Sequence, residues 1–156
     1  DAWEVHNYAL GDETGSITIN VSNATVFSSL YSPNNFGQEK FGASIEVDRQ
    51  EIVQMRRIDE LVPEYIPNAD VANVFLKMDT QGHDHAVFEG AGRFRSQFCA
   101  IQSEVSVLPI YEGVPSYIES IEIYRAQGYE VSGVFVVNRH RQTGHVIEFD
   151  CVLTPI

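Results

Sequence analysis

The first third of the chain alternates apolar and polar residues, which is typical of β-strands that pack one face against a core. Strands are predicted over residues 3–10 and 16–21, and the glycine-containing turn between them favours a hairpin. Another alternating stretch, residues 44–53, predicts a further strand. Residues 22–44 are rich in Ser, Asn, Gly and Pro, so we expect a long loop with little regular structure, of the kind that often carries function.

The middle of the chain changes to continuous apolar runs. Residues 71–79 form such a run and end in a carboxylate, which is the pattern of a parallel strand covered on both faces. A brief helix over 57–62, stopped by Pro63, is predicted before this strand. Helical spacing follows it over 83–91, and a second apolar strand is predicted over 98–107.

The last third of the chain predicts one helix and a closing hairpin. The helix is predicted to begin at Pro115 and to end at Gly128, because proline favours the first helical turn and glycine favours helix ends. Residues 129–138 and 145–153 read as two strands joined by a polar turn, and therefore as an antiparallel hairpin.

The order strand, helix, strand, helix and hairpin indicates an α/β fold with a mostly parallel sheet, in a single domain over residues 1–156. Right-handed crossovers bring the C-terminal ends of the two central strands to one edge of the sheet, where ligands bind in such folds. Asp79 and Glu104 are both expected at this edge.

Composition narrows the classes of partner. The chain has 10 basic and 22 acidic residues and a formal net charge of -12, which disfavours binding to nucleic acid. No run of 18 apolar residues occurs and no leader-like segment opens the sequence, so we expect a cytoplasmic protein that does not bind membranes.

The residues at the predicted sheet edge allow several kinds of chemistry. A carboxylate at the end of a strand, such as Asp79, can act as a general base, accept hydrogen bonds from an amine, bind a metal or cap the next helix. Lys77 lies within the predicted covered strand and needs a partner there, for which Glu104 is the candidate. That pair is either a structural ion pair or a substrate or cofactor contact.

Metal binding at this edge is an alternative that we disfavour. His83 and His85 stand at the start of the predicted helix, where two residues of that spacing point about 200° apart and cannot easily share one ion. We therefore predict no metal, although an α/β enzyme with a cation between Asp79 and Glu104 stays open as a second hypothesis.

Several short segments of the chain stand in the order of motifs from one protein family. The most specific is Leu76-Lys77-Met78-Asp79-Thr80-Gln81-Gly82, followed by Asp84 and by residues 87–91. The others lie at residues 7–15, 28–30, 57–61, 101–106, 111–113, 128–129 and 149–150. Together they resemble the FkbM family of S-adenosylmethionine-dependent methyltransferases, whose signature reads "lKiDvqGfE..VlkGa" around the first segment.

This resemblance implies a class I, Rossmann-like methyltransferase fold, in which a seven-stranded sheet binds S-adenosylmethionine at the C-terminal edge of its strands. Members typically methylate hydroxyl oxygens of sugars or natural products, so a small-molecule or glycan acceptor is expected. By position, Leu10 and Asp12 would contact the cofactor, with Asp12 near the adenine. Asp79, Gln81 and Gly82 would line the methionine side and the acceptor. Asp79, Glu104 and Lys77 are the catalytic candidates.

The chain departs from the family pattern in two respects. Asp84 stands where the family usually has Glu, which shortens the reach of the carboxylate. The family's glycine-rich first strand and its second strand, which lie between the third and fourth strands of the sheet, have no counterpart before Trp3. We expect that this half exists elsewhere, or that strands re-pair, for example 3–10 beside 71–79 or across a homodimer. A non-catalytic binding or oligomerisation module is the alternative function.

Overall fold

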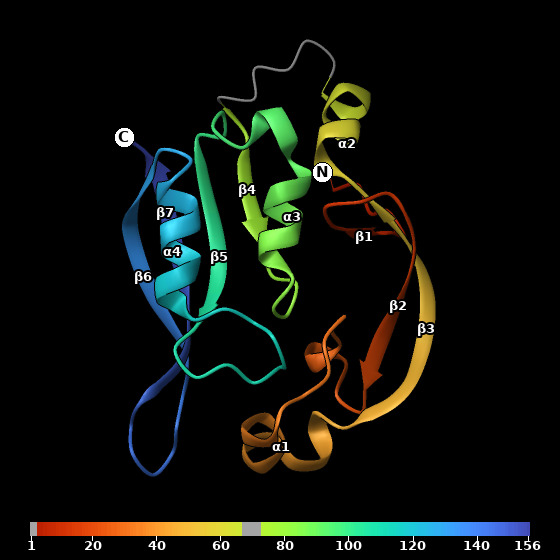
Figure 1. Ribbon diagram of the computed structural model, residues 1–156, viewed down its shortest axis with the longest axis vertical. Helices are drawn as coiled ribbons and strands as arrows, with labels where there is room; N and C mark the ends of the chain where they lie inside the picture. The colour runs from red at the N-terminus through yellow and green to blue at the C-terminus, as the bar shows by residue number, and fades with distance from the viewer. Residues whose placement is uncertain (1–2, 67–72) are drawn as a thin grey trace.

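The computed structural model describes residues 3–66 and 73–156, which form two β-sheets with helices packed against them (Figure 1). The N-terminal sheet has the strand order β1-β3-β2, and the C-terminal sheet has the order β4-β5-β7-β6. The predicted mixture of helices and strands is therefore confirmed, as an α/β arrangement with two sheets.

The N-terminal sheet is built around β3 (Val47–Arg56). β2 (Gly15–Ser22) runs antiparallel to it, and β1 (Ala9–Leu10) runs parallel to its other edge. The predicted hairpin of 3–10 with 16–21 is therefore wrong, because both segments pair with β3. The strand predicted over 3–10 is also much shorter, since Trp3 and Val5 are more than 90% exposed and have no surface to pack against.

The segment expected to be a long irregular loop contains a helix. α1 (Asn35–Phe41) begins at Asn34, whose side chain accepts a hydrogen bond from the backbone N–H of Gly37. The short helical turns η1 (Thr25–Phe27) and η2 (Gly42–Ser44) flank it. Apolar side chains from this segment pack against the buried Ile45, so its polar composition reflects capping and turns rather than a lack of structure.

The helix α2 (Ile58–Tyr65) continues through Pro63, which the sequence predicted would stop it. Two features hold the helix together past the proline: Ile58 and Val62 are buried, and the N–H of Ile66 donates to the carbonyl of Val62 at 2.9 Å. Packing of the apolar face therefore outweighs the backbone hydrogen bond that proline cannot make.

The C-terminal sheet contains the parallel pair that the sequence predicted. β4 (Phe75–Met78) runs parallel to β5 (Ala100–Ser106), with Met78 opposite Ser103. Residues 73, 74 and 79 of the predicted strand 71–79 are not part of β4. Residues 71 and 72 lie outside the described part of the chain.

The closing hairpin makes this sheet mixed rather than mostly parallel, which corrects the prediction. β6 (Tyr129–Arg139) and β7 (Val146–Pro155) pair antiparallel as expected, but the returning strand β7 lies next to β5 and is antiparallel to it as well. Residues directly opposite each other on β5 and β7 project from the same face of the sheet, and Glu104 stands opposite Asp150.

Helices α3 (Asp84–Gly90) and α4 (Tyr117–Arg125) both lie over one face of the C-terminal sheet (Figure 1). Their buried side chains, including Phe88 and Tyr124, form the main core with one face of β5 and β7. The other face of β4 is more open, because Phe75 is 48% exposed. The expectation that this strand is covered on both faces is therefore wrong for its described residues.

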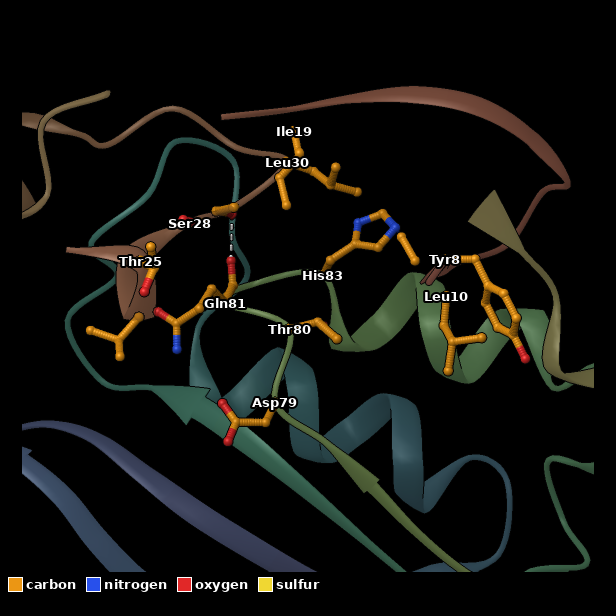
Figure 2. A pocket seen from close by; sticks show the side chains of 13 residues that line it. Tyr8, Leu10, Ile19, Thr25, Ser28, Leu30, Asp79, Thr80, Gln81 and His83 are labelled. Atoms are coloured by element: carbon orange, nitrogen blue, oxygen red, sulfur yellow. Dashed lines mark hydrogen bonds between the residues drawn. The ribbon is translucent and has the colours of Figure 1, made fainter. Parts of the chain in front are cut away.

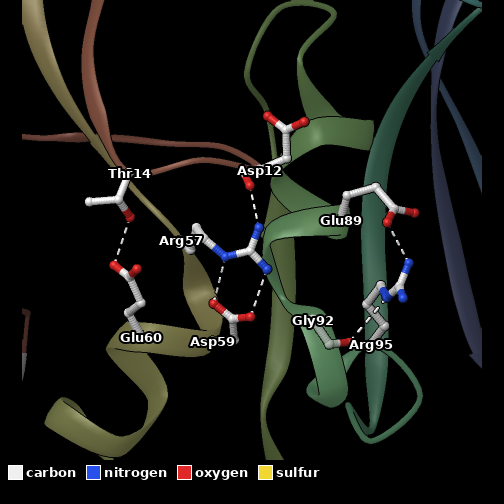
Figure 3. A network of polar contacts seen from close by, with 8 residues as sticks. All are labelled: Asp12, Thr14, Arg57, Asp59, Glu60, Glu89, Gly92 and Arg95. Carbon is white, nitrogen blue, oxygen red and sulfur yellow. Dashed lines mark hydrogen bonds and ion pairs between the residues drawn. The ribbon is translucent and has the colours of Figure 1, made fainter.

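The two sheets meet where α3 approaches the turn after β1. Gly90 lies so close to this turn that a Cβ atom there would overlap the carbonyl of Gly11. Nearby, the guanidinium of Arg57 pairs with Asp59 and donates to the backbone carbonyl of Asp12 (Figure 3). β1 and β4 belong to different sheets, so the predicted re-pairing of 3–10 beside 71–79 is wrong.

Candidate active site

The chain leaves β4 through a tight turn that leads directly into α3. Gln81 has φ 50° and Gly82 has φ 96°, so both adopt left-handed backbone conformations. A side chain at Gly82 would also collide with Val114. Glycine satisfies both requirements at position 82. The turn can therefore bring the residues after β4 against the loop that follows β5.

Asp84, the first residue of α3, holds this turn to the neighbouring strand. Its Oδ1 accepts hydrogen bonds from the backbone N–H of Thr80 (3.0 Å) and from the Thr80 hydroxyl (2.6 Å). Its Oδ2 accepts from the Ser103 hydroxyl (2.7 Å) and from the backbone N–H of Glu104 (3.1 Å). The shorter carboxylate at this position therefore reaches both the end of β4 and β5.

Gln81 joins three segments that are far apart in the sequence. Its Nε2 donates to Glu104 Oε2 at 3.2 Å, and its Oε1 accepts from the Tyr111 hydroxyl at 3.1 Å. Its backbone carbonyl accepts a 2.7 Å hydrogen bond from the Ser29 hydroxyl. The loop before α1, the loop after β5 and the end of β4 are thereby fixed to one another.

Glu104, which is partly buried, and Glu148, which is buried, lie on the face of the sheet opposite α3 and α4. Burial, with the charges of Glu148, Asp79 and Asp150 added, raises the pKa of Glu104 to about 8. Burial and the charge of Asp79 raise the pKa of Glu148 to about 7. These two side chains therefore hold protons near neutral pH, where ordinary carboxyl groups have lost theirs.

Lys77 does not pair with Glu104, which corrects the sequence prediction. Its Nζ lies 2.7 Å from Asp79 Oδ2, and both side chains are about half exposed, at 50% and 53%. Alternate residues of an extended chain point to the same face, so Lys77 reaches Asp79, just after β4, before it reaches the more buried Glu104. The hydrogen bond to Asp79 raises the pKa of Lys77.

A cavity of about 640 Å³ opens beside this cluster, between the N-terminal sheet and the turn after β4. Figure 2 shows Leu10 and Tyr8 at one end of it, Gln81 and Asp79 towards the other, and His83 between them. Its lining residues are Tyr8, Ala9, Leu10, Ile19, Thr25, Val26, Ser28, Ser29, Leu30, Asp79, Thr80, Gln81 and His83. This volume suits a small-molecule ligand.

The structure places three of the predicted cofactor-binding residues, Leu10, Asp79 and Gln81, in the wall of this cavity. Asp12 and Gly82 are not in the wall. Asp12 is exposed on the turn after β1, although its charge adds to burial in raising the pKa of Tyr31. Gly82 contributes through its backbone turn instead.

His83 and His85 point away from each other, as their spacing predicted. His83 lines the cavity, is 9% exposed, and has its Nδ1 3.4 Å from the Tyr31 hydroxyl. His85 packs edge-on against the ring of Tyr124, 5.5 Å away, which belongs to the core. Within residues 3–66 and 73–156, no group of three or more His, Cys, Asp or Glu side chains is arranged to hold a metal ion.

Sequence reasoning missed two residues of the cluster as functional candidates. Tyr111 entered only through a short motif, and nothing in its neighbours indicated a contact with Gln81. Glu148 belongs to none of the motifs, although acidic residues at alternate positions 148 and 150 of an otherwise apolar strand predict a polar stripe on one face.

Comparisons with known proteins give one match. A family model described as the methyltransferase FkbM domain matches residues 2–131. The match covers β4, the turn after it and β5, but ends before β7 and therefore before Glu148. No curated protein and no solved structure matches the chain significantly. None of the helices in the described parts of the chain has the length and apolar character needed to cross a membrane.

Proposed function

The chain belongs to the FkbM methyltransferase family, and from this premise we propose that it transfers a methyl group from S-adenosylmethionine to a hydroxyl oxygen of a sugar or natural product. The observation that carries the proposal is the position of Asp79 and Gln81. Both line the cavity, and both also belong to the cluster around Glu104. Asp79 and Gln81 therefore lie between the cavity, which has room for a small-molecule cofactor, and the acidic side chain of Glu104.

The residues of the cavity fit the proposed cofactor. Leu10 offers apolar surface to a flat ring, and the carboxylate of Asp79 offers a negative charge to a sulfonium or an amino group. When bound, S-adenosylmethionine supplies an activated methyl group on a positively charged sulfur. Leu10 and Asp79 would hold the two ends of such a molecule.

The protein's own contribution is to orient the acceptor and remove its proton. Methyl transfer needs the acceptor oxygen held about 3 Å from the methyl carbon and a base near the hydroxyl. Asp79 is exposed at the cavity wall and is the candidate base, while Glu104 is fixed by Gln81 and, with its pKa raised to about 8, accepts a proton only at more alkaline pH. Lys77 keeps the Asp79 carboxylate in one position through its ion pair.

We also propose a place for this fold within the family's sheet. β4, β5, β7 and β6 would form one side of it and β1 would be its third strand, with the family's first two strands between β1 and β4. Two facts support this assignment: β4 is at the edge of its sheet, and β1 lies in the other sheet.

Calorimetry with the full-length protein tests the cofactor. We expect binding of S-adenosylmethionine at micromolar concentration. If no heat of binding is measured, a non-catalytic module is the better explanation.

Asp79→Asn should lower the turnover number by about tenfold to a hundredfold without changing stability, because it removes a general base. The matched control is Asp48→Asn on the exposed part of β3, which should turn over at the normal rate. Normal turnover by Asp79→Asn would contradict the catalytic role.

A further inference from the structure

His83 carries an unsatisfied polar atom in the wall of the cavity. Its Nε2 is the one buried side-chain nitrogen or oxygen without a hydrogen-bond partner in residues 3–66 and 73–156. Leaving such an atom unpaired is costly, so native structures seldom keep one unless a water or a ligand satisfies it. Because the imidazole lines the cavity, a molecule bound there can supply the missing partner.

The surroundings of His83 fix the direction of its ring. On one side, Nδ1 lies 3.4 Å from the Tyr31 hydroxyl, and the two ring centres are 5.8 Å apart. On the other side, Nε2 lies 3.0 Å from the point that a Cβ at Gly11 would occupy, and the thioether of Met55 lies beside the same point. Neither a glycine α-carbon nor a thioether is a strong hydrogen-bond partner. A methionine side chain is flexible, so it can give way to a ligand group at Nε2.

The partner that best fits Nε2 is a neutral hydroxyl group. Burial lowers the pKa of His83, and the charges of Asp12 and Asp84 offset this only in part, so the imidazole is neutral near pH 7. A neutral imidazole has one N–H and one bare nitrogen, and the hydrogen bond at Nδ1 decides which of them is Nε2. A hydroxyl both donates and accepts, so it satisfies Nε2 in either case.

The position of His83 in the cavity indicates which hydroxyl this is. Figure 2 shows the His83 ring between Leu10 at one end and Asp79 towards the other. In the proposed function, Leu10 meets the flat adenine of S-adenosylmethionine and Asp79 meets its sulfonium or amino group. A ribose with two free hydroxyl groups joins these two parts of the molecule. We propose that His83 binds this ribose through a hydrogen bond between Nε2 and one of the two hydroxyls.

This inference rests on the proposed function but concerns how the cofactor is held, and the two fail in different ways. A full-length protein that does not bind the cofactor product S-adenosylhomocysteine would refute both. A protein that binds this product without regard to residue 83 and to the ribose hydroxyls would refute the His83 inference alone. Neither measurement needs turnover.

Calorimetry with three probes measures the hydrogen bond: S-adenosylhomocysteine, its 2′-deoxy counterpart and its 3′-deoxy counterpart. One of the deoxy probes should bind the unchanged protein about five- to tenfold more weakly than S-adenosylhomocysteine, because it leaves Nε2 without a partner. A sugar-like acceptor also carries hydroxyls, and it would be the better partner for Nε2 if both deoxy probes bound as tightly as S-adenosylhomocysteine. That outcome would overturn the proposal.

His83→Phe keeps an aromatic ring of similar size and removes both ring nitrogens. It should bind S-adenosylhomocysteine about five- to tenfold more weakly, and the penalty for the missing hydroxyl should disappear. His83→Gln places an amide near the position of Nε2 and should restore part of that penalty. Equal weakening of all three probes by His83→Phe would mean that the residue acts through packing alone, and would refute the inference.

The matched control is His85→Phe, because His85 packs against Tyr124 and is absent from the cavity wall. It should bind all three probes as the unchanged protein does. A loss in His85→Phe equal to that in His83→Phe would contradict a specific contact.

Nitrogen NMR of the histidine rings gives a second measurement, which needs no variant to fold. The Nε2 resonance of His83 should move when S-adenosylhomocysteine binds to the unchanged protein, and should move much less with the weaker deoxy probe. An Nε2 resonance that stays in place while S-adenosylhomocysteine binds would overturn the proposal.

Discussion

At the scale of single residues, the acidic cluster shows how position changes the chemistry of one side-chain type. Asp79 is half exposed and paired with Lys77 at the surface of the cavity. Glu104 lies on the neighbouring strand β5. It is more buried than Asp79 and lies near Glu148, Asp79 and Asp150, so it retains its proton to a higher pH. Two neighbouring acids thus stand in different surroundings, and burial raises the pKa of Glu104 to about 8.

This difference predicts how stability depends on pH. The pKa of Glu104 rises from its ordinary value of 4.5 to about 8 in the folded protein, so the folded state binds its proton more tightly than the unfolded state. Stability should therefore fall as pH rises between these two values. Glu104→Gln removes this dependence, and should stabilise the protein at pH 8.5 by at least about 1 kcal/mol more than at pH 5.

Urea denaturation of both proteins at the two pH values measures the effect. Glu89→Gln, an exposed change on α3 that meets Arg95 instead of the cluster, is the control and should not reproduce the pH dependence. A Glu104→Gln effect of equal size at both pH values would mean that burial does not retain the proton.

At the scale of elements, Asp84 is the residue that joins β4, the turn after it and β5. It is 3% exposed and satisfies four donors on these segments. Asp84→Asn replaces one acceptor oxygen by an amide that faces donors, so it should lower the free energy of unfolding by about 1–3 kcal/mol.

The same change should displace Glu104 as well, because the Glu104 N–H loses its acceptor on Asp84. Asp84→Glu, which restores the family's usual residue, tests whether charge or length matters: if charge alone matters, it should keep most of the stability. Thr80→Val removes a single side-chain donor of the set and should cost less than Asp84→Asn. Equal costs for the two variants would argue against Asp84 as the junction.

Elements that depend on local signals could be predicted from the sequence, whereas those that depend on distant partners could not. β4 and β5 follow from their apolar runs, and the β6–β7 hairpin follows from its short turn. β2 pairs with β3 instead of β1. The periodicity of a segment indicates a strand but does not indicate which other strand it pairs with. α1 was not predicted because asparagine, which caps this helix at Asn34, is also common in loops.

The candidate site divides in the same way. The placement of Asp79 and Glu104 at one sheet edge follows from parallel pairing, and the register of Met78 with Ser103 confirms it. The predicted partner of Lys77 is wrong because β4 is open on one face, where Lys77 pairs with the exposed Asp79. Glu148 was not predicted, because its contact with the cluster exists only once β7 lies beside β5.

At the scale of the whole molecule, the cavity takes its walls from both sheets. Leu10 and Ile19 come from β1 and β2, whereas Asp79 and Gln81 come from the turn after β4. The Ser29–Gln81 hydrogen bond, the contact of His83 with Tyr31 and the packing of α3 against the turn after β1 already join these walls. A ligand that fills the cavity should add further contacts between the two sheets.

Backbone hydrogen exchange measures this coupling directly. At about a hundredfold excess over its dissociation constant, S-adenosylhomocysteine should stabilise the protein by about 2.7 kcal/mol and slow exchange in residues 25–31 and 79–83 together. The turn at 140–144 joins β6 to β7 far from the cavity wall, so its exchange should stay unchanged and serves as the internal control. Protection confined to one of the two walls would place the ligand outside the cavity, and the cofactor would then need a different site.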